Sequence, residues 1–310
     1  MSIVVVGAVF VDIKGFPDGI YDPAGRNAGR VVTVHGGVGR NVAEDIANVE
    51  LRPTFVSMVD DTPSGADVIK KLQNHKVNTD YVLTRPDGMG LWLAVFDNTG
   101  DLAGSISKRP DLDALKELLD EKGDEIFCKA DSIVLEVDMD KDIVKRILRY
   151  AEKYHVKVFG VVSNMAIASQ RRDFFQSIDC FVCNVLEAGI LFVSDFSSLT
   201  PEQLSVELQE RITKANIPSM VVTLGERGAV YAQRGGERGY YPSESVLVRD
   251  TSGAGDAFCA GVAIGLTYGK DLRDAVRIGT HLAASVIMVS ENTCPRFLPS
   301  ELGLDIQIQE

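Results

Sequence analysis

Residues 250–258, Asp-Thr-Ser-Gly-Ala-Gly-Asp-Ala-Phe, place two glycines and a carboxylate directly before an apolar run. Gly253 and Gly255 let backbone N–H groups turn inward without obstruction by a Cβ atom. The apolar run predicts a helix that begins there, and the free N–H groups of a helix N-terminus attract anions. Asp256 would lie in the first turn, where a carboxylate can accept a proton from an attacking hydroxyl. The stretch therefore indicates a phosphoryl-transfer turn, with a simple capped helix as the alternative.

A second glycine-rich stretch covers residues 35–41, His-Gly-Gly-Val-Gly-Arg-Asn, after a β-branched run at 31–34. Its glycines would let a ligand contact the backbone, and the Asn41 amide can both donate to and accept from a diol. A tight strand–helix turn is the alternative. Asp12 follows the first apolar run and is a further candidate for hydroxyl binding, or a simple loop carboxylate.

The two stretches together resemble the signatures of the ribokinase-like carbohydrate and nucleoside kinases, the PfkB family. The resemblance implies that Asp256 is the catalytic base and that the backbone of Gly253, Ala254 and Gly255 forms the anion hole. It also implies an acceptor site, with the residues Asp12, Gly37, Asn41 and Glu136 at or near the substrate hydroxyls.

The same resemblance implies ATP as the donor, with Mg²⁺. Asn184 and Glu187 match an N-x-x-E motif that acts on the magnesium–phosphate site, Glu187 through bound water. The nucleotide-binding turn would comprise residues 223–228, with Thr223, Gly225 and Gly228 as contacts. Asp250 and Ser252 match a monovalent-cation site, so K⁺ activation is a further expectation.

One departure from the family pattern follows the predicted strand at 156–159. Relatives carry Asp or Asn and then Pro there, whereas this chain continues with Gly160. A polar group near the metal-bound water is then missing, or Ser163 or Asn164 replaces it.

The acceptor is suggested by three details: Arg40 before Asn41, the turn at 97–101, and residues 290–295. Together they resemble bacterial pseudouridine kinases more than ribokinases or fructokinases. The implied reaction is ATP-dependent phosphorylation of the 5′-hydroxyl of pseudouridine. The alternatives are a ribokinase- or fructokinase-type sugar kinase, an adenosine-type nucleoside kinase, and a non-catalytic nucleoside-binding protein. Arg40 could equally be a solvated residue at a helix start.

Alternating strand and helix patterns position these motifs. Repeated β-α-β units predict a parallel sheet with helices on both faces, and ligands bind beyond the carboxyl ends of such strands. With the resemblance, the expected fold is a three-layer α/β/α ribokinase-like sandwich, mainly parallel, formed by one domain over residues 1–310. Alternation at 91–97 and 102–107 predicts a β-hairpin, and lid strands are expected from about 13–34 and 90–107.

Composition and charge exclude other classes. The 310-residue chain has a net charge of −12, which argues against nucleic acid polymers and anionic membranes as partners. No Gly-x-Gly-x-x-Gly follows the first strand, and residues 265–271 end in Asp rather than completing a P-loop. No signal peptide or apolar run of about 18 residues is present.

The five cysteines do not form a disulfide framework or a zinc site. Cys180 and Cys183 fall on a predicted strand, where residues three apart point to opposite faces. They are expected to be buried structural thiols in a reducing cytoplasm. Lid strands with an exposed apolar face often pair between subunits, so a homodimer is expected.

Overall fold

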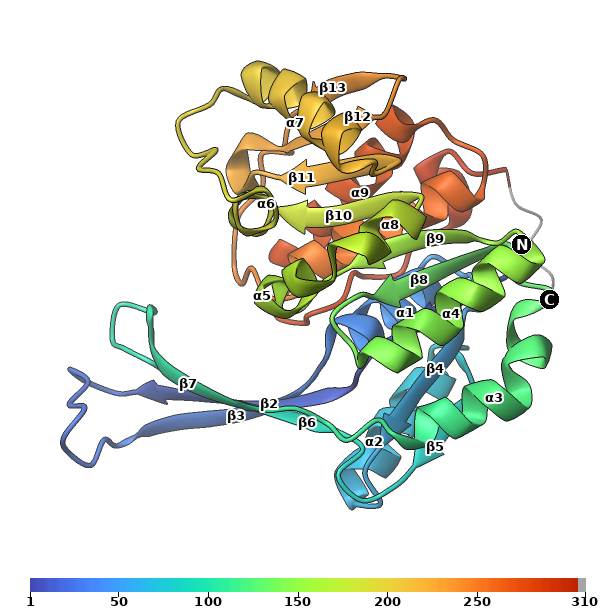
Figure 1. Ribbon diagram of the computed structural model, residues 1–310. Coiled ribbons are helices and arrows are strands. Elements are labelled where there is room, and N and C mark those ends of the chain that lie inside the picture. The colour runs from blue at the N-terminus through green and yellow to red at the C-terminus, as the bar shows by residue number, and fades with distance from the viewer. Residues whose placement is uncertain (306–310) are drawn as a thin grey trace.

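Residues 1–305 are described by a computed structural model, and they form three layers from which a narrow sheet projects (Figure 1). The central sheet has the strand order β13-β12-β11-β10-β9-β8-β1-β4-β5. Its strands are β1 (Ile3–Val6), β4 (Thr54–Val59), β5 (Asn78–Thr84), β8 (Ser132–Glu136), β9 (Lys157–Val161), β10 (Cys180–Asn184), β11 (Ser219–Thr223), β12 (Ala229–Gln233) and β13 (Arg238–Tyr241). The seven neighbouring strands from β11 through β1 to β5 are parallel. At the other edge, β12 pairs antiparallel with β11, and β13 pairs antiparallel with β12. All four residues of β1 are buried, as expected for a parallel strand covered on both faces.

Helices cover both faces of this sheet, as predicted. One face packs against α1 (Val38–Asn48), α2 (Pro63–Asn74), α8 (Ala254–Thr267) and α9 (Leu272–Ile287). The other face packs against α3 (Ala114–Phe127), α4 (Lys141–Tyr154), α5 (Met165–Ala168), α6 (Val185–Phe192) and α7 (Pro201–Ala215). Three short 3₁₀ helices complete the elements: η1 (Ser169–Ser177), η2 (Gly225–Arg227) and η3 (Pro299–Leu302).

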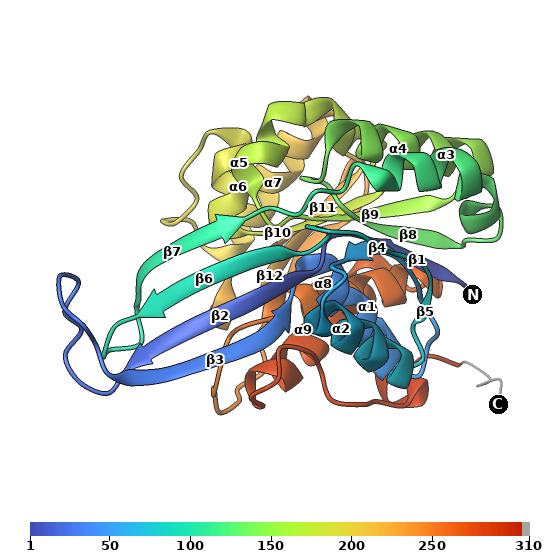
Figure 2. The ribbon, with the colours of Figure 1, turned by 90° about the horizontal axis from the view of Figure 1, so that it is seen from below.

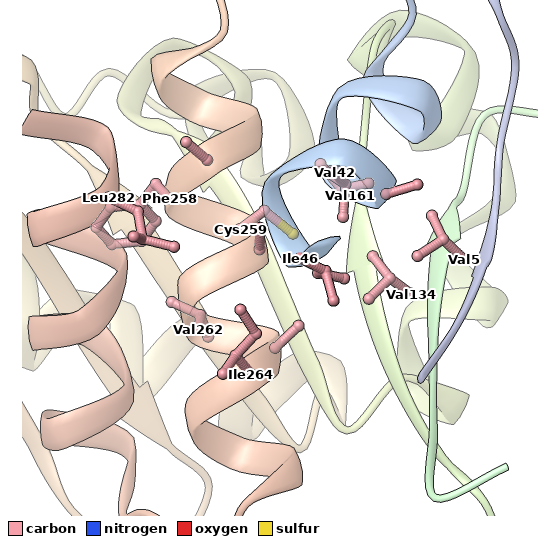
Figure 3. Close-up of a cluster of buried hydrophobic side chains, with 14 of the residues drawn as sticks. Val5, Val42, Ile46, Val134, Val161, Phe258, Cys259, Val262, Ile264 and Leu282 are labelled. Atoms are coloured by element: carbon pink, nitrogen blue, oxygen red, sulfur yellow. The ribbon is translucent and has the colours of Figure 1, made fainter. Parts of the chain in front are cut away.

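Close packing of α1 and α8 on the sheet fixes the two predicted glycine-rich turns relative to each other. Figure 3 shows Val42 and Ile46 of α1 between Cys259 of α8 and the strand residues Val134 and Val161. Helices α8 and α9 also approach closely, because a Cβ atom on Gly261 would lie only 2.6 Å from the Gly279 Cα.

The two cysteines of β10 lie on opposite faces of the sheet, which confirms the expectation from their spacing. Cys180 packs in the cluster beneath α8 and α9, and Cys183 packs in the cluster beneath α3 to α7. Both thiols are free. Within residues 1–305, no helix combines the length and the apolar character that a membrane crossing requires.

The projecting sheet contains β2 (Phe10–Pro17), β3 (Gly29–Gly36), β6 (Gly90–Phe96) and β7 (Leu102–Lys108), in the order β3-β2-β6-β7. We call these four strands the lid; Figure 2 shows them extending to one side of the body. The hairpin of β6 and β7 confirms the sequence prediction, and a parallel pairing of β2 with β6 joins it to the hairpin of β2 and β3. The strand β2 itself begins earlier than the expected lid boundary.

The carboxyl ends of β1 and β8 form the switch point of the sheet. From β1 the strand order runs through β4 to β5 in one direction, and from β8 through β9 to β13 in the other. Such a reversal leaves a crevice at the carboxyl ends, the usual ligand site of open α/β sheets. Both predicted glycine-rich turns lie beside this crevice.

Candidate active site

The start of α1 lies directly on the end of β1. Gly37 caps this helix with a φ of 98°, and a Cβ atom there would lie 2.4 Å from the Ala8 carbonyl oxygen. A Cβ atom on Gly7 would lie 2.6 Å from the Gly39 Cα. Both the backbone conformation and the lack of space therefore require glycine in this turn.

Asn41 and Asp256, 215 residues apart, meet at the crevice. The Asn41 Nδ2 donates to the Asp256 Oδ2 at 2.7 Å. Asn41 is buried, and within residues 1–305 its Oδ1 has no hydrogen-bond partner. A buried, unsatisfied acceptor costs free energy, so this oxygen indicates a donor that a bound ligand would supply. A hydroxyl group fits that requirement.

Asp256 lies in the first turn of α8, as predicted. Burial raises the pKa of its carboxyl group to about 6, and the hydrogen bond from Asn41 opposes that rise. The charge of Asp12 also raises the pKa. A carboxylate with a pKa near neutrality is suited to accept a proton from a hydroxyl.

Asp12 lies on β2 rather than in a loop, and its carboxylate packs against the second turn. A Cβ atom on Gly36 would lie 2.5 Å from its Oδ2. Burial raises the pKa of Asp12, and the positive charges of Lys14 and Arg40 oppose that rise. The structure thus brings the predicted acceptor residues Asp12, Gly37 and Asn41 together around Asp256.

A cavity of about 750 Å³ adjoins this cluster. It runs from the N-terminus of α8 to the end of β11 and is bounded by α9. Its walls include five predicted residues from two separate motifs: Thr223, Gly225, Gly228, Ala254 and Gly255. The predicted nucleotide turn and anion hole therefore share one cavity, which is large enough for a nucleotide.

Gly253 caps α8 and has a φ of 81°, a conformation that favours glycine. A Cβ atom there would lie 2.0 Å from the carbonyl oxygen of Asn292. The first turn of α8 is therefore seated against Asn292, and Ala254 and Gly255 of that turn line the cavity.

Glu136, the fourth predicted acceptor residue, lies beneath the crevice. Its Oε2 accepts from the Ala8 N–H at 2.9 Å, and the residue is only 2% exposed. Burial and the charge of Asp138 raise its pKa to about 8. In this structure Glu136 supports the turn after β1, and its contact with an acceptor remains a prediction.

The departure at Gly160 has a packing explanation. This glycine lies inside β9, and a Cβ atom on it would lie 3.0 Å from the Phe181 ring. The first polar residue beyond the strand is Ser163. Its N–H and Oγ both donate to the buried carboxylate of Asp138, at 2.9 and 2.8 Å. Asn164 instead caps α5.

Asn184 and Glu187 form a reciprocal cap at the start of α6. The Asn184 Oδ1 accepts from the Glu187 N–H at 2.9 Å, and the Glu187 Oε2 accepts from the Asn184 N–H at 2.8 Å. Burial and the charge of Asp138 raise the pKa of Glu187. The motif thus caps α6 in the described chain, and its action on the magnesium–phosphate site stays a prediction.

The carboxylates at this edge fit a magnesium–nucleotide complex. Glu187 raises the pKa of Asp256, and Asp256 raises that of Glu136, so a cation would relieve their mutual repulsion. Yet no group of three or more His, Cys, Asp or Glu side chains within residues 1–305 could hold a metal by itself. Mg²⁺ is usually held by one or two carboxylates together with water and substrate phosphates.

The predicted monovalent-cation residues lie beside a lysine of the lid. The Asp250 Oδ1 accepts from the Ser252 N–H at 2.8 Å, and Lys14 Nζ donates to the Ser252 Oγ at 3.0 Å. The positive charge of Lys14 helps to lower the pKa of Asp250. A charged group of the chain itself therefore already lies next to these two residues.

The three details that suggested pseudouridine are explained by internal contacts. Arg40 is fully buried, forms an ion pair with Glu44 at 2.5 Å and donates to the Asn292 Oδ1 at 3.1 Å. The turn at 97–101 folds on itself, with the Asp97 Oδ1 accepting from the N–H groups of Thr99 and Asp101. Arg40 is thus buried rather than solvated.

Residues 292–294, which we call the C-terminal strap, bind α1. The Thr293 Oγ1 donates to the Glu44 Oε1 at 2.9 Å, and the Cys294 N–H donates to the Asp45 Oδ1 at 2.6 Å. Because Asn292 also contacts the first turn of α8, the strap joins the starts of the two helices that form the site.

Two residues of this region were missed from the sequence. Lys14 follows Asp12 at the alternate position of β2, within the expected lid region, but it was not named as a site residue. Asp138 lies two residues after Glu136, just beyond the end of β8. This short spacing from a predicted site residue was the signal that could have identified it.

Comparison with known proteins gives a consistent result. The family described as "pfkB family carbohydrate kinase" matches residues 1–295. The guanosine-inosine kinase of Exiguobacterium acetylicum is 35% identical, over 94% of this chain and 96% of that protein. The pseudouridine kinase of Escherichia coli is 25% identical, over 89% and 87% of the two chains. The structure of Arabidopsis thaliana ribokinase complexed with ribose and ATP aligns with a TM-score of 0.82 at 21% identity, covering 98% of this chain and 99% of that chain.

Proposed function

Because the chain belongs to the pfkB family of carbohydrate kinases, phosphotransferases with a hydroxyl acceptor, we propose that it phosphorylates the 5′-hydroxyl of a nucleoside with ATP. One observation carries the proposal. Asp256 has its carboxylate held by Asn41, while its helix begins at the turn that lines the nucleotide-sized cavity. A base for the acceptor and an anion hole for the phosphoryl group thus lie in one helical turn.

The chemistry follows from these positions. Asp12, Gly37 and Asn41 hold the ribose hydroxyls, and the Asn41 Oδ1 accepts from one of them. Asp256 takes the proton of the 5′-hydroxyl while the hydroxyl oxygen bonds to the γ-phosphorus of ATP. The bond between this phosphorus and the β,γ-bridging oxygen breaks, and ADP leaves. The backbone N–H groups of Ala254 and Gly255 stabilise the charge on the transferred group. The lid excludes water, so that the acceptor rather than water is phosphorylated.

Mg²⁺, when bound with ATP, neutralises charge on the phosphates. Glu187 would hold it through water, and Asp138 lies close enough to act on the pKa of Glu187. K⁺ at Asp250 and Ser252 is a separate proposal, and the contact of the Lys14 ammonium with Ser252 argues against it.

Guanosine and inosine are the first candidates for the acceptor, because the guanosine-inosine kinase is 35% identical across nearly both chains. Pseudouridine is the second, supported by the kinase that is 25% identical over 89% of this chain. The internal roles of Arg40 and Asn292 remove sequence details that had favoured pseudouridine. A cytoplasmic location, where ATP is available, goes with either acceptor.

We also propose a homodimer formed through the outer face of the lid. The strand register places Val31, Leu93 and Ile106 on the face opposite Asp12. Val31 and Ile106 are each 70% exposed. An exposed apolar sheet face of this kind is typically covered by another chain.

A turnover assay with ATP and Mg²⁺ tests the function. It should compare guanosine, inosine, pseudouridine, uridine, adenosine, ribose and fructose by kcat/KM. We expect a nucleoside to exceed both free sugars by at least about tenfold, because a site that binds a base leaves polar groups unpaired with a sugar. A free sugar with the highest kcat/KM would refute the nucleoside proposal and leave the family-level activity intact.

Asp256→Asn tests the base. We expect kcat to fall by ~10²–10⁴-fold with ATP affinity nearly unchanged. Asp142→Asn is the matched control, since Asp142 lies in the first turn of α4, exposed and on the other face of the sheet. Retention of more than about half of the wild-type kcat by Asp256→Asn would contradict the assignment.

A further inference from the structure

We propose that Lys14 of the lid binds the transferred phosphoryl group, so that the lid supplies part of the phosphate site. This inference rests on the proposed kinase function. Lys14 Nζ donates to the Ser252 Oγ at 3.0 Å, although the two residues are 238 positions apart. Ser252 immediately precedes Gly253, the cap of α8. The lid ammonium therefore lies at the edge of the proposed anion hole.

Lys14 also faces the acceptor residues. It follows Asp12 by two positions on β2, and residues two apart on a strand share a face. The carboxylate of Asp12 lies against Gly36, next to the acceptor turn. One strand thus carries a proposed hydroxyl ligand and a cation directed to the phosphate loop.

Lys14 lies close enough to Asp12 and Asp250 for its charge to act on the pKa of both carboxyl groups, yet it forms no ion pair with either. Within residues 1–305 its ammonium forms no ion pair with a carboxylate, and its hydrogen bond is to a neutral hydroxyl. In contrast, the buried Arg40 is paired with Glu44, and Arg109 contacts Asp138. An unpaired, half-buried ammonium is free to bind a phosphate oxygen.

The surrounding charges make such a cation necessary. Asp12, Asp250, Asp256 and Glu187 lie in or beside the site, and the chain carries a net charge of −12. A triphosphate entering this region is repelled by these carboxylates. An ammonium between the acceptor and the anion hole offsets that repulsion where the phosphoryl group passes.

Nucleotide binding to Lys14→Met and Lys14→Gln tests the inference without turnover. We expect the affinity for a non-hydrolysable β,γ-imido ATP analogue, measured by calorimetry with Mg²⁺ and a bound nucleoside, to fall roughly 10- to 100-fold. ADP affinity should stay within about twofold, because ADP lacks the γ-phosphate. Lys14→Arg should retain part of the analogue affinity, since it keeps the charge.

Lys108→Met is the matched control. Lys108 lies on the same sheet in β7 and pairs with Asp87, so its loss changes the charge of the lid by the same amount. We expect wild-type affinities for both nucleotides. Equal losses for ADP and the analogue, unchanged affinities for both, or a loss confined to the nucleoside would each overturn the assignment of Lys14. Absence of turnover in the wild-type protein would instead refute the proposed function.

Discussion

At the scale of single residues, the site is a set of carboxylates whose pKa values are raised. Burial raises the pKa of Asp12, Glu136, Glu187 and Asp256, and several of these groups add to the effect on one another. Such clusters are typical of functional sites because a base must lie near the working pH. Asp256 is the carboxyl group of this set that accepts a hydrogen bond from Asn41, and this bond favours the ionised form that a base requires.

The pH dependence of turnover should report this arrangement. Asp256 must be ionised to act, and its pKa is raised to about 6. We therefore expect kcat/KM to fall as the pH drops below about 6, approaching tenfold per pH unit. Asn41→Ala removes a hydrogen-bond donor to the carboxylate and so raises the pKa of Asp256. The acidic limb of the pH–rate profile, where kcat/KM falls, should therefore move to higher pH, and acceptor binding should weaken.

A pH–rate profile of both proteins between about pH 5 and 8 makes the measurement. Movement of the limb to lower pH in Asn41→Ala would contradict the assigned hydrogen bond. An unmoved limb would show that another group limits the rate.

At the scale of elements, the start of α8 determines whether the anion hole forms. Gly253→Ala should strain the backbone at φ 81° and place a methyl group against the Asn292 carbonyl oxygen. We expect a loss of ~1–3 kcal/mol in the free energy of unfolding, together with reduced turnover. Urea denaturation monitored by circular dichroism measures the stability change.

Gly255→Ala provides the contrast within the same turn. A Cβ atom there meets no atom within 4 Å and would face the cavity that Gly255 lines. Stability should be unchanged or raised by up to about 1 kcal/mol, since alanine favours helices, while nucleotide affinity falls. Equal destabilisation of the two variants would argue against a special position for Gly253.

The elements were predicted well where one physical signal dominated. The start of α8 follows from the apolar run after Gly255, and β1 follows from an uninterrupted apolar run. The start of β2 was placed too late, at about residue 13 rather than Phe10, because Asp12, Lys14 and Gly15 interrupt the apolar alternation.

The site was predicted as motifs, and its three-dimensional contacts were not. The resemblance placed Asp256 and Asn41 in one site, yet no spacing rule reveals their hydrogen bond across 215 residues. The contact of Lys14 with Ser252 depends on the lid register, which the sequence leaves open. Arg40 was interpreted as a detail resembling pseudouridine kinases or as a solvated residue at a helix start, whereas it is buried and paired with Glu44 one helical turn away.

At the scale of the whole molecule, the lid presents two chemically different faces. One carries Asp12 and Lys14 toward the site, and the other exposes Val31, Leu93 and Ile106. The parallel pairing of β2 with β6 holds both hairpins in one sheet, as Figure 2 shows. A partner on the outer face would therefore support the strand that carries the acceptor and phosphate ligands.

Ile106→Lys should test this connection. A charge on the outer face opposes burial, so we expect light scattering during gel filtration to show a dimer for the wild type and a monomer for the variant. The monomer should bind the acceptor more weakly. Leu186→Lys, at a leucine 75% exposed on α6, is the control and should remain dimeric. A monomeric wild-type protein would refute the dimer proposal.

The C-terminal strap has a consequence for how the chain is made. Glu44 and Asp45 emerge from the ribosome about 250 residues before Thr293 and Cys294, which bind them. Until then, Asp45 lacks the Cys294 N–H that donates to it, and the first turn of α8 lacks the support of Asn292. Contacts so distant in sequence form late. A nascent chain would therefore lack this link between the two halves of the catalytic centre until residue 294 has left the ribosome, and kinase activity would be delayed until then.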